Sequence, residues 1–198
     1  MPMIPKSLYH YHEKSRAPFL SISETGTRQF VEIMNEVGRS PIRDNRFDTQ
    51  EKRDFYHFFR IYTEKKIRSE FIGKGGQPKL KAPRYMTLGP TNWFSDWYEE
   101  AEVIEIPLSE FDESYISFTY PDSMMSMLIA ENRYEPFAKF KRPYHGKVFM
   151  LSELVQLVEE YGFPNEEDAE NLEHGNRIIE AQIWDLAVIE DHIWRGKN

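Results

Sequence analysis

Aromatic side chains are the feature of this sequence that most restricts the folds open to it. The 198 residues include 14 Phe, 11 Tyr and 4 Trp, and aromatic residues make up 15% of the chain. Burying rings of this size offsets much of the conformational entropy that a chain loses on folding. The sequence therefore predicts a fold with an aromatic core, and it leaves open that some rings line a pocket for a flat ligand.

The absence of cysteine excludes several kinds of site. Because no Cys occurs, disulfides, thiolate zinc centres, iron–sulfur clusters and cysteine nucleophiles are ruled out. The first residues lack the charged and apolar regions of a signal peptide. No window approaches the roughly 18 apolar residues that a membrane span needs. These features favour a cytoplasmic protein.

The charge of the chain is negative overall but uneven. A net charge of −8 argues against binding to nucleic acid, whose phosphates are neutralised by Lys and Arg. Residues 65–84 nevertheless form a basic segment, which contains Lys65, Lys66, Arg68, Lys74, Lys79, Lys81 and Arg84. Its glycine-rich part, 73–79, lacks the spacing of a P-loop and is interpreted as a helix C-terminus with cations that complement the helix dipole. A phosphate or nucleic-acid contact by the basic segment remains an alternative function.

Hydrophobic periodicity predicts helices early in the chain and mostly strands later. Apolar residues recur at helical spacing in 27–37 and in 49–72, where the repeated positions are Phe55, Phe58, Phe59, Tyr62 and Ile67. A short helix is expected after Pro90 and another at 152–161. Strands are predicted at 7–12, 85–88, 103–108, 115–119, 146–151 and 177–184, with 121–142 irregular apart from one helical turn.

This segregation of helices and strands favours an α+β fold over a parallel, doubly wound sheet. We expect a mixed, largely antiparallel sheet with the N-terminal helices packed on it. Neither side of the segment 74–83 is large enough to be comfortably stable alone. The chain is therefore predicted to form a single domain over residues 1–198.

Two histidines on the first predicted strand could bind a metal ion. His10 and His12 lie two residues apart, so their rings should project from one face of the strand. A metal site needs at least one more ligand, which the sequence does not place nearby. The sequence also lacks the G-x-S-x-G and H-E-x-x-H motifs of common hydrolases. We therefore predict no metal site and no standard hydrolase.

Five segments spread over the chain resemble an uncharacterised family of small bacterial cytoplasmic proteins. They are Leu8-Tyr-His-Tyr-His12, Tyr85-Met-Thr-Leu-Gly-Pro90, Ile106-Pro-Leu-Ser-Glu-Phe-Asp112, Ile116-Ser-Phe-Thr-Tyr120 and Tyr144-His-Gly-Lys-Val148. This resemblance implies one intact bacterial domain and no particular activity.

Three of the strand segments also resemble motifs of ADP-ribosyltransferase-like domains. Leu8-Tyr-His10 resembles their opening strand, Tyr85-Met-Thr87 their second motif strand, and Ile179-Glu-Ala-Gln-Ile-Trp184 the late strand that bears a catalytic glutamate. The resemblance implies a split antiparallel sheet and an enzyme that acts on NAD or on a related ribose-phosphate substrate.

The same resemblance implies which residues act. Glu180 would stabilise the oxocarbenium-like ribose carbon, His10 would anchor the other ribose, and Tyr85 would stack on nicotinamide. The cofactor would also contact Tyr9, His12, Thr87 and Gln182. The sequence departs from the family pattern in that Tyr11 and His12 stand where a small residue and Thr are typical.

A function without catalysis is the main alternative. Residues 118–127 combine aromatic, methionine and small polar side chains, a mixture found on adaptable binding surfaces. Together with the lack of a complete catalytic motif, this composition is compatible with a protein-interaction module, for example one from a mobile element or a stress response.

Overall fold

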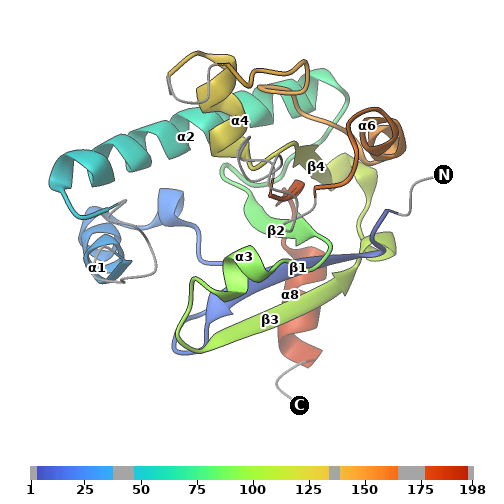
Figure 1. Ribbon diagram of the computed structural model, residues 1–198. Helices are drawn as coiled ribbons and strands as arrows, with labels where there is room; N and C mark the ends of the chain where they lie inside the picture. The colour runs from blue at the N-terminus through green and yellow to red at the C-terminus, as the bar shows by residue number, and fades with distance from the viewer. Residues whose placement is uncertain (1–3, 38–46, 134–138, 165–176, 196–198) are drawn as a thin grey trace.

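A five-stranded antiparallel sheet forms the centre of the fold (Figure 1). The computed structural model describes residues 4–37, 47–133, 139–164 and 177–195. The strands are β1 (Ser7–Glu13), β2 (Arg84–Leu88), β3 (Ala101–Pro107), β4 (Ile116–Thr119) and β5 (Glu180–Ile183), in the order β3-β1-β2-β5-β4. Every neighbouring pair is antiparallel. The predicted α+β class is confirmed, and the sheet lacks parallel pairs within the described residues.

Six α-helices accompany the sheet in the described part of the chain. They are α1 (Thr27–Val37), α2 (Gln50–Gly73), α3 (Asn92–Ser95), α4 (Ser123–Ala130), α6 (Leu154–Tyr161) and α8 (Ala187–Arg195). A 3₁₀ turn, η1 (Ile22–Glu24), lies before α1. Among these described helices, none is both long and apolar enough to cross a membrane.

Local sequence explains where the longest helix begins and ends. The Thr49 side chain caps α2 by accepting a hydrogen bond from the Lys52 amide at 3.3 Å. After Gly73 the chain turns through Gly75, whose φ of +100° favours glycine. At Gly76 a Cβ atom would lie 2.5 Å from the Phe71 ring, so only glycine fits without displacing the ring. The predicted helix end at this segment is confirmed, but the last turn of α2 contains no basic residue. Lys74 and Lys79 form ion pairs with Glu153 and Asp185 instead.

The two faces of the sheet are covered differently. On one face Leu8, Met86 and Ala181 belong to the main core, which also includes residues of α6 and α8. On the other face Trp184 packs with Phe59 and Phe71 of α2 and with Met127 of α4. Ala181 and Trp184 therefore lie on opposite faces, as the alternation of side chains along a strand requires.

Two predictions about the later part of the chain are wrong. Residues 146–151 form no regular strand: Phe149 makes one isolated bridge with Phe118, and the 3₁₀ turn Leu151–Glu153 follows. The Met150 amide donates to the Glu153 carboxylate at 2.7 Å, which turns the chain away from the sheet. Residues 121–142 contain a complete eight-residue helix, α4, whose N-cap Asp122 accepts from the Met125 amide at 2.9 Å.

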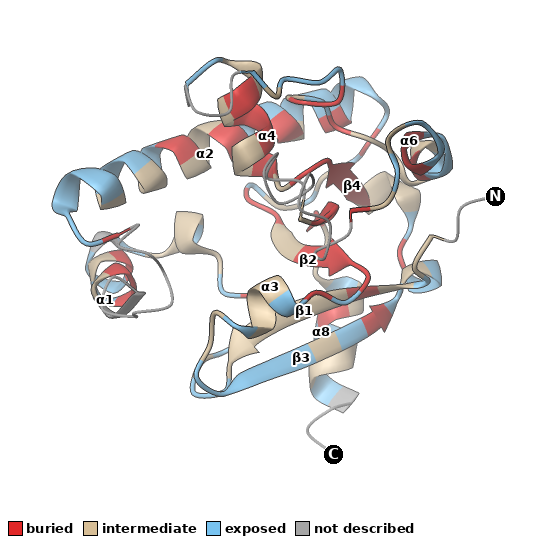
Figure 2. Cartoon of the chain, viewed as in Figure 1, coloured by how far each residue is buried: buried red, intermediate tan, exposed pale blue. Residues whose placement is uncertain are grey.

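Only some of the apolar residues that recur along α2 are buried in the core. Phe59 and Ile67 are completely buried, whereas Phe58 is 64% exposed and Phe55 is 48% exposed. In Figure 2 the buried residues of α2 lie where it crosses the sheet, and its N-terminal turns project beyond the sheet. Beneath this projecting end lies α1, whose Phe30 stacks on His57 with ring centroids 4.0 Å apart. The overhang therefore provides one wall of a cavity.

Candidate functional site

A cavity of about 950 Å³ lies between the sheet, α2, α3 and α4. Aromatic rings make up much of its wall: Tyr9, Tyr11, Phe47, Phe55, Tyr56, Tyr85, Trp93, Phe94, Trp97 and Tyr98. Charged side chains also border it, among them Arg60, Arg177, Asp122 and Glu180. A large apolar cavity with a few convergent polar groups is the usual form of a small-molecule site.

Strand pairing brings Tyr85 and Glu180 to the same face of the sheet. Thr87 of β2 lies directly opposite Glu180 of β5, and Tyr85 lies opposite Gln182. Because residues paired across an antiparallel sheet share a face, all four point toward α2 and α4. Tyr9, which pairs with Thr87, extends this row into β1.

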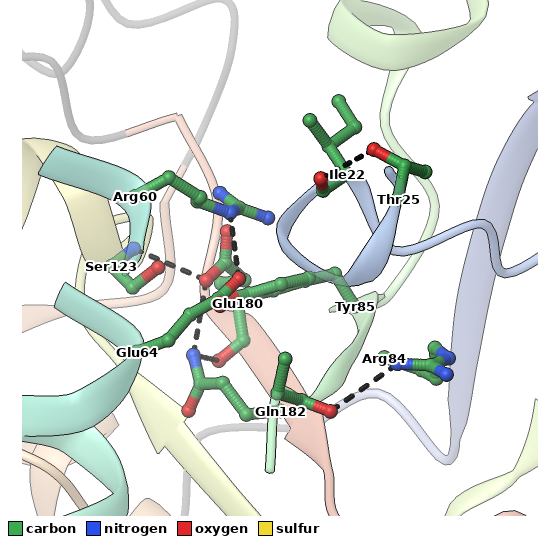
Figure 3. Close-up of polar contacts among 10 residues, drawn as sticks. Ile22, Thr25, Arg60, Glu64, Arg84, Tyr85, Ser123, Glu180 and Gln182 are labelled. Atoms are coloured by element: carbon green, nitrogen blue, oxygen red, sulfur yellow. Dashed lines mark hydrogen bonds and ion pairs between the residues drawn. The ribbon is translucent and has the colours of Figure 1, made fainter. Parts of the chain in front are cut away.

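Glu180 lies on the floor of the cavity and is almost fully buried. Its Oε1 atom accepts hydrogen bonds from the Ser123 amide at the start of α4 (3.2 Å) and from the Gln182 side chain (3.1 Å). Figure 3 shows these groups converging from β5 and α4. Burial raises the pKa of the Glu180 carboxyl to about 7, although nearby Arg60 lowers it. The group can therefore change its charge near neutral pH.

A buried triad on α2 and β2 lies beside this carboxyl. Arg60 Nε donates to Glu64 Oε1 at 3.1 Å, and the Tyr85 hydroxyl donates to the same oxygen at 3.1 Å (Figure 3). The Arg60 guanidinium also stacks on the Tyr85 ring, 3.8 Å from its centroid. Burial raises the pKa of Tyr85 well above its usual value, so its hydroxyl remains protonated. The triad fixes the ring of Tyr85 next to Glu180.

The His10 ring points away from this group of residues. Alternation along β1 places Tyr9 and Tyr11 on the face of Glu180, and His10 and His12 on the opposite face. The His10 ring stacks on Phe19 with centroids 3.9 Å apart. Nδ1 donates to the Tyr85 carbonyl at 2.9 Å, and Nε2 accepts from the Phe19 amide at 2.8 Å. Part of His10 borders the cavity, but this arrangement leaves neither ring nitrogen available to a ribose.

The remaining predicted contacts divide into two groups. Tyr9 and Thr87 border the cavity. Gln182 is fully buried behind Glu180, where its amide also donates to Thr119 at 3.0 Å. His12 is not among the residues that border the cavity, and its Nδ1 bonds the Glu13 carbonyl at 3.0 Å. In this structure Gln182 therefore positions the carboxyl, and His12 contributes to the first strand.

Tyr11 helps to build the cavity wall. It stands at the position where the resembled motif of ADP-ribosyltransferase-like domains typically has a small residue. Its hydroxyl accepts a hydrogen bond from the Thr91 amide at 2.9 Å. Thr91 is the N-cap of α3, which carries Trp93 and Phe94. Tyr11 also lies against Phe94, with ring centroids 6.3 Å apart. This side chain therefore ties the aromatic wall on α3 to β1.

Several important residues of the site were absent from the sequence prediction. Arg60 and Glu64 form an oppositely charged i, i+4 pair on the same side of α2 as buried Phe71. A charged pair on the buried side of a predicted helix is a signal that could have identified them from the sequence. Asp122 lies in the methionine-rich segment 118–127 and Arg177 begins the predicted strand 177–184, but neither was singled out as a site residue. Arg177 stacks over Trp93, 3.8 Å from the centroid of that ring. Folding brings Arg60, Asp122 and Arg177 to one cavity, and Glu64 contacts Arg60 from behind it.

The raised pKa of Glu180 predicts a pH-dependent contribution to stability. Between its unfolded value of 4.5 and its folded value of about 7, the folded chain binds more protons at this group than the unfolded chain. The free energy of unfolding contributed by Glu180 should therefore be highest below pH 4.5 and fall as the pH rises to about 7. By linkage the total loss is about 3 kcal/mol.

His10 contributes in the opposite direction, which determines how the effect is measured. Burial lowers the pKa of His10 from 6.5 to about 4, so its contribution to stability rises over that interval. Urea unfolding of the wild type and of Glu180→Gln at pH 4.5, 6 and 7.5 separates the two groups. The stability difference between wild type and variant should fall with pH, and a constant difference would contradict the assignment to Glu180.

Most cations of the basic segment are engaged within the chain. Lys66, Lys74, Lys79 and Arg84 form ion pairs with Glu131, Glu153, Asp185 and Glu24 respectively. Arg68 donates to the carbonyls of Leu80 and Pro78 at 3.0 and 3.1 Å. These contacts neutralise or occupy the cations that would otherwise bind the phosphates of a nucleic acid. We therefore do not propose a nucleic-acid function for this segment.

His10 and His12 do not form a metal site in the described residues, and comparison with known proteins does not identify the function of the cavity. Over the described ranges there is no group of three or more His, Cys, Asp or Glu side chains arranged to hold a metal ion. The resemblances drawn from the sequence remain predictions, because they rest on short segments. No protein-family model matches the chain, and no curated protein or solved structure matches it either.

Proposed function

We propose that this protein binds a nucleotide in the aromatic cavity and acts on the bond between base and ribose, with NAD as the substrate class. The observation that carries the proposal is the buried carboxyl of Glu180 on the floor of a cavity walled by aromatic rings. The three segments that resemble ADP-ribosyltransferase-like motifs lie on the adjacent strands β1, β2 and β5. Their adjacency supports the proposal without establishing the family.

The cavity has the composition that a nucleotide requires. Bases and nicotinamide stack on aromatic side chains, and rings project into the cavity from β1, β2, α2 and α3. Two arginines, Arg60 and Arg177, border the same space and could meet phosphate groups. At about 950 Å³ the cavity lies at the upper end of the usual range for ligand sites, as a dinucleotide needs.

The chemistry follows from the position of Glu180. When the bond between the ribose C1′ and the nicotinamide nitrogen breaks, its electron pair leaves with neutral nicotinamide. The positive charge that develops on the ribose is stabilised by an ionised carboxylate held in a dry site. Water, or a nucleophile on an acceptor, then forms the new bond to C1′ and loses a proton. Tyr85, held by Glu64 and Arg60, would support the nicotinamide ring.

His10 has no direct contact with substrate in this proposal, because both of its ring nitrogens are bonded within the protein. It instead supports the floor of the site, since it links the Phe19 turn to the backbone of Tyr85. Substrate contacts are assigned to Glu180, Tyr85, Thr87 and Tyr9.

Binding of NAD can be tested with a matched pair of tryptophans. Trp93 borders the cavity, whereas Trp194 is 72% exposed on α8 and does not border it. Trp93→Ala should weaken binding of NAD and ADP-ribose by about 1–3 kcal/mol, the value of one base–aromatic stack. Trp194→Ala should bind both ligands as the wild type does.

Isothermal titration of the wild type and both variants with each ligand gives the affinities directly. Absence of heat with both ligands in the wild type would overturn the proposed function. Equal losses in the two variants would place the ligand outside the cavity.

A further inference from the structure

Arg60 is a mostly buried cation with hydrogen-bond donors left over. Its side chain is only 17% exposed, and it borders the cavity. A guanidinium carries five N–H groups. Of these, Nε–H donates to Glu64, and within the described residues the four hydrogens on Nη1 and Nη2 have no hydrogen-bond partner. Within the described residues no Arg60 nitrogen is among the fully buried polar atoms that lack a hydrogen-bond partner. Because Arg60 borders the cavity, its Nη groups are open to water or a ligand there.

Two other arginines on the same helix show that this is unusual. Arg53 donates to the Phe47 and Asp48 carbonyls and to the Asn35 side chain. Arg68 donates through Nε and Nη2 to two backbone carbonyls. Arg53 bonds both of its Nη groups to the protein and Arg68 bonds one, whereas Arg60 donates to the protein only through Nε. The position of Arg60, rather than a general shortage of acceptors, leaves its outer edge unpaired.

The orientation of Arg60 is fixed before any ligand arrives. Glu64 holds Nε, and the flat face of the guanidinium lies on the Tyr85 ring. These contacts use one donor and one face, so the edge formed by Nη1 and Nη2 remains. Two parallel N–H groups on such an edge match the oxygens of a phosphate. Burial would lower the pKa of Arg60, but the surrounding Tyr85, Tyr56 and Glu64 raise it, so the cation persists.

We propose that the Nη edge of Arg60 is an anion subsite that binds a phosphate group of the nucleotide. This inference rests on the proposed function, and it names the feature that would select a phosphorylated ligand over a nucleoside. Arg177, which borders the same cavity, adds positive charge to the site. Glu64 balances the charge of Arg60 when the subsite is empty.

The test compares ligands with and without phosphate. Isothermal titration measures NAD against nicotinamide riboside, and ADP-ribose against adenosine, for wild type and Arg60→Lys. The lysine keeps the charge but loses the two-pronged edge. We expect the variant to lose about 10- to 100-fold in affinity for NAD and ADP-ribose. Its affinity for the two nucleosides should remain within about twofold of the wild type.

Additional variants guard against a simple loss of structure. Arg60→Met combined with Glu64→Gln removes both charges, while the glutamine can still accept from the Tyr85 hydroxyl. Thermal melting reports whether each variant folds. Arg68→Lys is the matched control, because Arg68 lies on the same helix but does not border the cavity. This control should leave the preference for phosphorylated ligands unchanged.

Each outcome has a distinct meaning. Titration with inorganic pyrophosphate probes the subsite without a nucleotide, and binding that weakens in Arg60→Lys supports it even if NAD does not bind. Equal loss of phosphorylated and unphosphorylated ligands would overturn the subsite and leave Arg60 as a support for Tyr85. Failure of the wild type to bind NAD and ADP-ribose, with pyrophosphate bound normally, would overturn the proposed function alone. Failure to bind any phosphorylated probe would overturn both.

Discussion

Replacing Glu180 with glutamine is expected to lower the rate of nicotinamide release from NAD by about 10²- to 10³-fold, the typical cost of removing one electrostatic stabiliser of a transition state. The substitution keeps the shape of the side chain and an oxygen that can accept from Ser123 and Gln182. It removes the negative charge that would stabilise the ribose carbon. Chromatographic measurement of nicotinamide gives kcat and KM for both proteins.

The division between kcat and KM distinguishes catalysis from binding. Because the carboxylate acts on charge that develops only in the transition state, KM should change little while kcat falls. Glu159→Gln, an exposed position on α6, is the matched control and should keep the wild-type rate. A wild-type kcat in Glu180→Gln would remove Glu180 from the chemistry.

The largest effect on stability is expected from Phe59. This ring of α2 is completely buried, and it belongs to the core cluster that also contains Trp184 and Met127. Phe59→Ala should therefore lower the free energy of unfolding by about 3–5 kcal/mol, through lost burial and the cavity left behind. The adjacent residue, Phe58, is 64% exposed, so Phe58→Ala should change stability by less than about 1 kcal/mol.

Urea unfolding of the two alanine variants measures this difference between neighbours. The same substitution is made at adjacent positions of one helix, so differences in helix propensity cancel. Similar losses in the two variants would mean that Phe58 is covered in solution, for example by a partner or a second copy of the chain.

The fold could be predicted largely because it depends on local patterns. The bounds of α1 and nearly those of α2 follow from helical spacing and from the glycines that terminate α2. Ala181 and Trp184 lie in different core clusters on the two faces of the sheet, as the alternation of side chains in the predicted strand 177–184 requires. Helical spacing could not predict that Phe59 is buried and Phe58 exposed, because the part of α2 that the sheet covers is set by tertiary structure. Residues 146–151 were wrongly predicted as a strand because they include apolar residues. In the structure the Glu153 carboxylate accepts a hydrogen bond from the Met150 amide, and the chain turns there.

The candidate site was less accessible to sequence reasoning. Tyr85 and Glu180 meet because β2 and β5 pair, although 95 positions separate them in the chain numbering. The expected position of His10 depended on which face its strand presents, and the register places its ring on the face opposite Glu180. Arg60 and Glu64 belong to a helix far from the predicted motifs, and their importance depends on tertiary contact with Tyr85.

The central claim is that one cavity holds a nucleotide with its ribose against Glu180. A crystal structure of Glu180→Gln with NAD bound tests this claim most directly, because the variant should bind substrate without consuming it. We predict the nicotinamide near Tyr85 and the ribose C1′ within about 3–3.5 Å of the side-chain oxygen of residue 180. NAD bound elsewhere on the protein, or with its ribose far from residue 180, would contradict the account.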